Sequence, residues 1–113
     1  MYSLMAQAVT SRSDVFRALA DPTRRAVFER LARGEATVSE LNAGFNVSQP
    51  AISQHLAHLR HAGLVMERRV GRNAYYRVRP AGLGPLITWI DRYQAFWGER
   101  IERLQSVLKE MDK

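Results

Sequence analysis

The chain has 113 residues, a length typical of one domain, and its 46% hydrophobic content can supply a core. It contains no cysteine, which excludes disulfides and cysteine-ligated metal sites and is expected of a cytoplasmic protein. The formal net charge is +6, and residues 60–84 hold six basic residues and one acidic residue. Such a local excess favours a polyanionic partner, either nucleic acid or an anionic membrane surface. Residues 1–10 lack the pattern of a signal peptide, and no apolar stretch is long enough to span a bilayer, so we expect no membrane insertion.

Start and stop signals place the first two helices. An N-terminal tail over residues 1–12 precedes a short helix that ends at Ala20. Asp21 and Pro22 then form a paired start signal, because Asp accepts hydrogen bonds from free amides and Pro has no amide to leave unbonded. Gly34 is suited to end this second helix.

Two further helices follow at short spacing. Residues 37–40 form a capping-box pattern that opens a third, short helix, and Gly44 ends it. Ser48 then caps a fourth helix over residues 49–62, whose apolar residues recur at i, i+4 and i+7. Two helices joined by a tight turn predict a helix-turn-helix, whose second helix lies in the DNA major groove.

The fourth helix begins with short polar side chains and has no Lys or Arg before Arg60. Amide and hydroxyl groups suit hydrogen bonding to base edges. For Gln49, Ser53 and Gln54 taken individually, an ordinary solvated position is the alternative. The residues that we predict to contact DNA from this helix are Ser48, Gln49, Pro50, Ser53, Gln54 and His55.

Residues 65–78 change to a strand-like pattern around Gly71 and Asn73, two residues that tolerate positive φ, and so predict a β-hairpin. Directly after a helix-turn-helix, this basic hairpin is interpreted as a wing that contacts backbone phosphates; solvated protection of a sheet edge is the alternative. The predicted wing residues are Arg68, Arg69, Arg72 and Asn73, with Arg24 or Arg25 as further phosphate contacts.

A long amphipathic helix is predicted from Pro85 to Met111, with apolar residues at nearly heptad spacing and both tryptophans of the chain. Pairing with the same helix of a second subunit explains this pattern best. Packing on its own domain alone is the alternative, and a small apolar ligand between aromatic helices would fit the same residues. The predicted interface consists of Trp89, Tyr93, Phe96, Trp97, Ile101, Leu104 and Leu108.

The sequence shows no pattern of catalytic or metal-binding residues. His55, His58 and His61 fan over about 120° of helix surface, so they cannot converge on one ion. There is no paired-carboxylate pattern, glycine-rich phosphate loop or nucleophile elbow. We therefore predict no metal, no cofactor and no enzymatic activity.

Three separated motifs resemble the ArsR/SmtB family of winged helix-turn-helix transcriptional regulators. They are ALADPTRR at residues 18–25, SQPAISQHL at residues 48–56 and RHAGLV at residues 60–65, in the family's order. The resemblance covers about residues 13–80. It implies a homodimer joined through its terminal helices, DNA contacts from the fourth helix and the wing, and repression by blocking a promoter.

The chain departs from the metal-sensing members of that family. Where their third helix offers a cysteine pair, this chain has TVSEL at residues 37–41. Where their last helix offers Asp and His, this chain has Asp91 and no histidine. The resemblance is therefore to a subgroup without the usual metal ligands, and it leaves the chemistry of any small-molecule effector open.

We predict a mainly α fold with a small β-hairpin (α+β), in the order α-α-α-α-β-β-α. It comprises a tail over 1–12, a winged helix-turn-helix core over 13–80 and a C-terminal dimerisation helix over 81–113, all in one structural domain. The predicted function is that of a homodimeric repressor that binds a pseudo-palindromic operator in double-stranded DNA. The alternatives are a winged-helix protein-interaction module without DNA binding and a small enzyme or ligand carrier.

Overall fold

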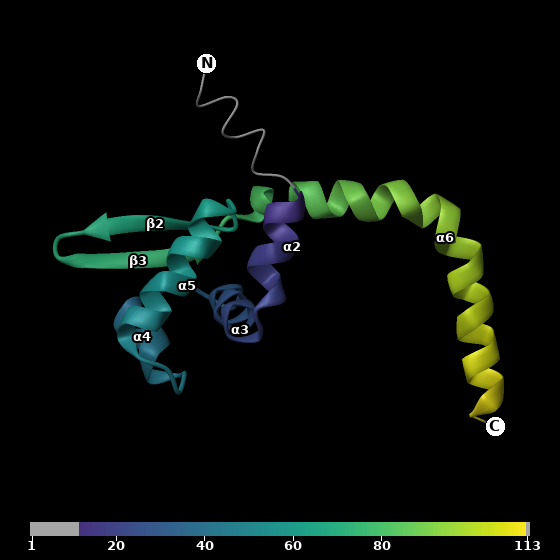
Figure 1. Cartoon of the computed structure of the whole chain (residues 1–113), viewed down its shortest axis with the longest axis horizontal. Coiled ribbons are helices and arrows are strands. Elements are labelled where there is room, and N and C mark those ends of the chain that lie inside the picture. The colour runs from purple at the N-terminus through teal and green to yellow at the C-terminus, as the bar shows by residue number, and fades with distance from the viewer. Residues whose placement is uncertain (1–11, 113) are drawn as a thin grey trace, which may run out of the picture.

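A computed structural model of the chain describes residues 12–112 and shows a helical core, a protruding hairpin and a long C-terminal helix (Figure 1). In chain order the elements are α2 (Arg12–Ala20), α3 (Pro22–Leu31), β1 (Ala36–Thr37), α4 (Val38–Ala43), α5 (Gln49–His61), β2 (Val65–Val70), β3 (Asn73–Val78), the 3-10 helix η1 (Pro80–Leu83) and α6 (Gly84–Met111). The predicted class and order are confirmed, with β1 and η1 as additions. Apart from Arg12, which begins α2, the predicted tail lies outside the described residues.

Side-chain caps fix where the core helices begin, as the sequence predicts. The Asp21 carboxylate accepts a hydrogen bond from the Arg24 amide at 2.9 Å, and this bond is the main cause that lowers the pKa of Asp21. At α4, the Thr37 amide donates to Glu40 Oε1 at 3.0 Å, while the Glu40 amide donates to Thr37 Oγ1 at 3.2 Å. This reciprocal pair is the predicted capping box.

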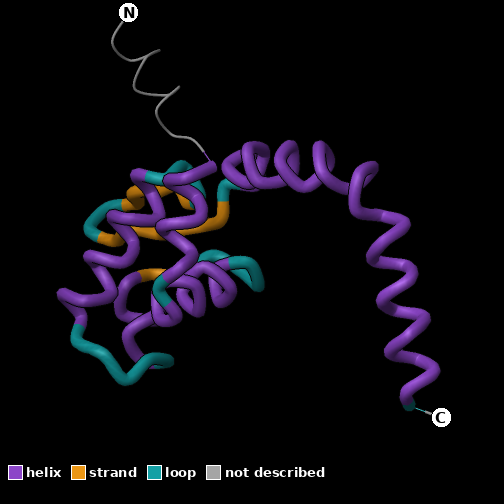
Figure 2. The backbone as a smooth tube through the Cα atoms, turned by 45° about the vertical axis from the view of Figure 1, so that its right-hand side comes forward, coloured by secondary structure: helices purple, strands orange, loops and turns teal. Residues whose placement is uncertain are grey.

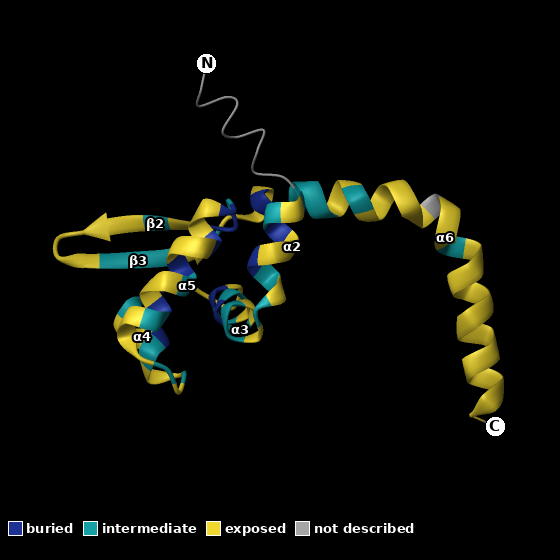
Figure 3. Cartoon of the chain, in the orientation of Figure 1, coloured by how far each residue is buried: buried dark blue, intermediate teal, exposed yellow. Residues whose placement is uncertain are grey.

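One apolar cluster joins the helices to the sheet, and it is coloured dark blue in Figure 3. α5 contributes Ile52, Leu56 and Leu59, each at most 1% exposed, so one side of this helix is fully buried. The other buried members are Val15, Ala18, Val27, Leu31, Ala36, Leu41, Ala62, Leu64 and Val65. Because the cluster takes only one side of α5, the opposite side remains exposed to solvent.

The hairpin belongs to a three-stranded antiparallel sheet in the order β1-β3-β2. The hairpin register runs from Val65 opposite Val78 to Val70 opposite Asn73, and Gly71 has a φ of +62° in the turn. Of the two residues that tolerate positive φ, only Gly71 adopts it: within residues 12–112 only glycines have positive φ, and Asn73 is the extended first residue of β3.

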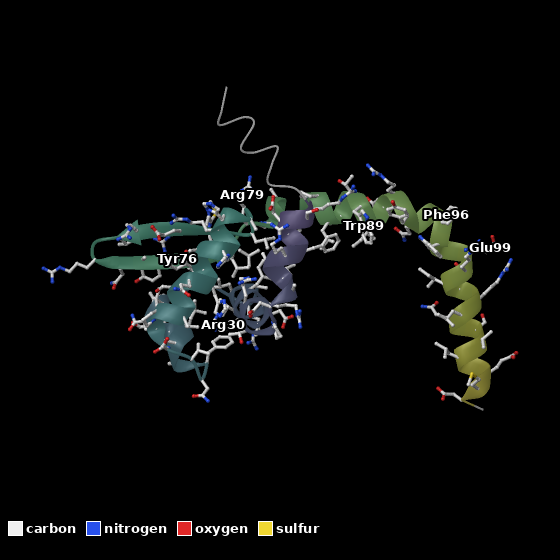
Figure 4. All side chains as sticks on the ribbon, viewed as in Figure 1. Arg30, Tyr76, Arg79, Trp89, Phe96 and Glu99 are labelled. Carbon is white, nitrogen blue, oxygen red and sulfur yellow. The ribbon has the colours of Figure 1, made fainter. Side chains whose placement is uncertain are left out.

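α6 packs on the core only near its start. The Phe16 ring of α2 meets the Trp89 ring edge to face, with 5.4 Å between centroids, and Trp89 in turn contacts Tyr93 at 5.3 Å. Beyond this contact the helix leaves the core and turns sharply near Phe96, close to Gly98, while the helical winding continues on both sides of the bend (Figure 2, Figure 4). None of the described helices is both long and apolar enough to cross a membrane.

Two glycines allow the connection after the wing to approach the end of α5. Gly63 follows α5 with a φ of +75°, and buried Gly82 of η1 lies directly against its backbone. A Cβ at Gly82 would overlap the Gly63 carbonyl oxygen, which is backbone and cannot rotate away.

We therefore expect Gly82→Ala to lower the free energy of unfolding by about 3 kcal/mol, because the added methyl group forces two backbone segments apart. Urea unfolding followed by circular dichroism measures this loss. Gly44→Ala is the matched control, since a Cβ there would meet only the Leu41 carbonyl at an ordinary 3.7 Å. Equal midpoints for the two variants would contradict the proposed backbone contact.

Candidate nucleic-acid interface

A fixed turn holds α4 and α5 in a helix-turn-helix. The Asn42 side-chain amide donates to the Val47 carbonyl at 2.7 Å, which closes the loop between the two helices. Ser48 Oγ then accepts from the Ala51 amide at 3.2 Å and starts α5. The hydroxyl proton of Ser48 remains free to donate outward.

The exposed surface of α5 carries most of the polar residues that the sequence predicts to contact DNA. Ser48, Gln49, Pro50, Ser53 and Gln54 are all exposed. None is charged, so this surface offers hydrogen-bonding groups without a fixed charge.

The exposed surface of α5 extends beyond the residues that were predicted from the sequence. Gln54 and His58, four residues apart, lie on one stripe of the helix and, with Ala57 and His61, line a shallow open hollow of about 460 Å³. The spacing 54, 58, 61 is visible in the sequence, but of the three histidines only His55 was predicted there to contact DNA. Among residues 12–112, no three His, Cys, Asp or Glu side chains lie close enough to hold a metal ion.

His55 lies on a different side of α5 from Ser53 and is less exposed than the other predicted residues. Its side chain is half-buried, and its Nδ1 is buried without a hydrogen-bond partner within the described part of the chain. It is close enough to the start of α3 for its charge to contribute to the lowered pKa of Asp21. The structure therefore does not place His55 beside Gln49 and Ser53.

The four predicted wing residues fall into two groups, two arginines that form ion pairs and two exposed residues at the tip. Arg68 forms a two-pronged ion pair with Glu35, with Nη2 to Oε1 at 2.6 Å and Nε to Oε2 at 3.3 Å, and this pairing lowers the pKa of Glu35. Arg69 Nε donates to Glu67 Oε1 at 3.1 Å. By contrast, Arg72 and Asn73 are exposed at the tip, and Arg72 has no ion pair with any described residue.

Arg24 and Arg25 connect two helices of the core. Arg24 Nε donates to the Ala18 carbonyl at 2.6 Å, and Arg25 Nη1 donates to the Leu19 carbonyl at 2.8 Å. Both guanidinium groups thereby satisfy free carbonyls at the end of α2. Their first role is structural, which the sequence-based suggestion of phosphate contacts did not foresee.

A helix-turn-helix with a neutral polar surface, followed by a cationic β-hairpin, defines a winged helix-turn-helix DNA-binding protein. A family model described as a helix-turn-helix domain matches residues 19–68. The HTH-type transcriptional regulator Rv2034 of Mycobacterium tuberculosis is 49% identical over 78 residues, which are 69% of this chain and 73% of that protein. The arsenical resistance operon repressor of Escherichia coli is 42% identical over 99 residues, covering 86% of this chain and 81% of that protein.

A solved structure agrees with these relatives. An ArsR-like transcriptional regulator from Rhodococcus sp. RHA1 superposes with a TM-score of 0.68 at 34% identity, covering 84% of this chain and 90% of that one. The chain therefore belongs to the ArsR family of DNA-binding transcriptional regulators, and the resemblance seen in its motifs is confirmed.

The pairing of the wing arginines predicts unequal effects on DNA binding. Arg72→Ala should weaken binding to every duplex and reduce the slope of log affinity against log salt by about 1, because it removes an unpaired cation from the tip. Arg68→Ala should change the slope less, because Glu35 already neutralises that charge. Fluorescence anisotropy on a labelled duplex at several salt concentrations measures both slopes, and a larger effect from Arg68→Ala would contradict this ranking.

Proposed function

We propose that the chain is a repressor that binds double-stranded operator DNA as a homodimer and blocks a promoter. The observation that carries this proposal is the exposed, uncharged face of α5, followed by a hairpin that projects from the core in Figure 1 and has exposed Arg72 in its turn. The Escherichia coli relative is named a repressor, which supports the direction of regulation.

The exposed face of α5 and the hairpin tip have different roles in DNA recognition. Gln49, Ser53 and Gln54 present amide and hydroxyl groups that can pair with base edges in the major groove. Arg72 supplies attraction to phosphates, which carries affinity but no sequence information. In the proposed dimer the two copies of α5 read half-sites about 34 Å apart, one turn of DNA, so the operator is pseudo-palindromic.

The exposed apolar row of α6 supports the homodimer. Six of the seven predicted interface residues are large exposed apolar side chains, and all of α6 past the bend is exposed in Figure 3 apart from Gly98. A lone chain would leave this row in water, whereas a second copy presents a matching row through twofold symmetry. The six are Tyr93, Phe96, Trp97, Ile101, Leu104 and Leu108. Trp89 differs, because it is half-buried against Phe16 of its own chain.

DNA recognition can be tested without knowing the operator. Selection of bound fragments from a random duplex pool, at stated salt, should yield a site with two related half-sites one turn apart. Gln54→Ala should then lower the preference for the selected site over a scrambled duplex by about tenfold, because one pair of base contacts is lost. Purified protein that binds no duplex even at low salt would overturn the proposal and favour a protein-interaction module.

The dimer can be tested on the part of α6 farthest from the core. Leu104→Arg should shift the protein from dimer to monomer in light scattering and weaken binding to the selected site at least tenfold, because a charge enters an apolar seam. Ser106→Arg is the matched control, since residue 106 lies on the opposite face of the same helix. A dimeric mass for Leu104→Arg, or a monomeric mass for both variants, would contradict the proposed seam.

A further inference from the structure

The carboxylate of Glu67 lies where the wing, the core and α5 meet. Its Oε2 accepts from the Tyr76 hydroxyl at 2.6 Å and from Arg60 Nη1 at 3.4 Å, and its Oε1 accepts from Arg69 Nε at 3.1 Å. The side chain is only 17% exposed. A single acidic group thus receives three donors from three different segments.

Each donor has a distinct place in the fold. Tyr76, labelled in Figure 4, is the cross-strand neighbour of Glu67 on β3 and packs against the apolar core. Arg60 belongs to the last turn of α5, and Arg69 lies two residues farther along β2, toward the wing tip. Glu67 therefore links the helix that faces bases to the hairpin that faces phosphates.

The surroundings keep Glu67 ionised and Tyr76 protonated. The Tyr76 hydrogen bond is the largest cause that lowers the pKa of Glu67, and both arginines lower it further. Burial, followed by the hydrogen bond to Glu67, raises the pKa of Tyr76. At neutral pH the carboxylate thus pairs with two guanidinium groups whose side chains are 57% and 70% exposed.

We propose that Glu67 is a positioning residue that determines specificity by fixing the wing relative to α5; this inference rests on the proposed DNA-binding function. With the carboxylate present, the hairpin contacts phosphates only where α5 sits in the correct register over the bases. Without it, Arg60 and Arg69 are free to follow the phosphates of any sequence, so non-specific binding strengthens while discrimination declines.

Glu67→Gln keeps the shape of the side chain and removes its charge. We expect this variant to bind a scrambled duplex more tightly than wild type, with a salt slope steeper by about 1, and to lose about tenfold in its preference for a duplex selected by the wild-type protein. Anisotropy titrations of both duplexes at several salt concentrations measure these quantities.

Glu35→Gln is the matched control. It removes the same charge beside another wing arginine, Arg68, but Glu35 has no hydrogen bond to α5 within residues 12–112. This control should steepen the salt slope and leave the preference for the selected duplex intact. If Glu67→Gln and Glu35→Gln lost the same amount of preference for the selected duplex, the loss of negative charge alone would explain the effect. That result would overturn the positioning role of Glu67.

Tyr76→Phe separates the effect of geometry from the effect of charge. Urea unfolding shows whether Glu67→Gln folds, and Tyr76→Phe replaces it as the test if it does not. It keeps the carboxylate but removes its shortest hydrogen bond, so the preference should fall while the salt slope stays at the wild-type value. Unchanged preference in both Glu67→Gln and Tyr76→Phe would overturn this inference alone. Wild-type protein that does not distinguish the two duplexes would overturn the proposed function as well.

Discussion

Burial of one side of α5 is the constraint on which the rest of the molecule depends. Ile52, Leu56 and Leu59 enter the core of α2, α3 and α4, and removing one such leucine from a core costs about 2–5 kcal/mol. This packing sets the rotation of α5, so its uncharged side faces outward. The chain then turns at Gly63 and starts the wing from buried Leu64 and Val65. The proposed base-reading surface and the proposed phosphate-binding surface therefore share one packed core.

Ion pairs neutralise more of the positive charge of the wing than the composition of residues 60–84 indicates. Residues 60–84 carry a formal +5, yet Glu35 and Glu67 engage Arg68, Arg69 and Arg60. Exposed ion pairs of this kind contribute little to stability. Their effect is instead to orient guanidinium groups, and they leave exposed Arg72 at the tip without an ion pair to any described residue.

The sequence predicts the features that depend on residues close together in the chain. The caps at Asp21, Thr37 and Ser48 and the hairpin over residues 65–78 follow from short patterns, and the structure has them as expected. β1 could not be predicted, because two residues carry no periodicity and are a strand only through pairing with β3. Nor could the Glu35–Arg68 pair, whose members are 33 residues apart and meet only when the sheet forms. The partial burial of His55 could not be predicted either, because it depends on where α3 packs against α5.

The bend in α6 gives the two tryptophans separate environments. Trp89 stays with the core, edge to face with Phe16, whereas Trp97 lies just past the bend, 42% exposed as a residue and with the Arg100 guanidinium over its ring. Indole emission depends on the polarity around the ring. The intrinsic fluorescence of the chain thus contains two signals, one that follows unfolding of the core and one that follows events along the distal helix. Dilution and denaturant should change them separately, so dissociation of the proposed dimer becomes visible while the core is still native.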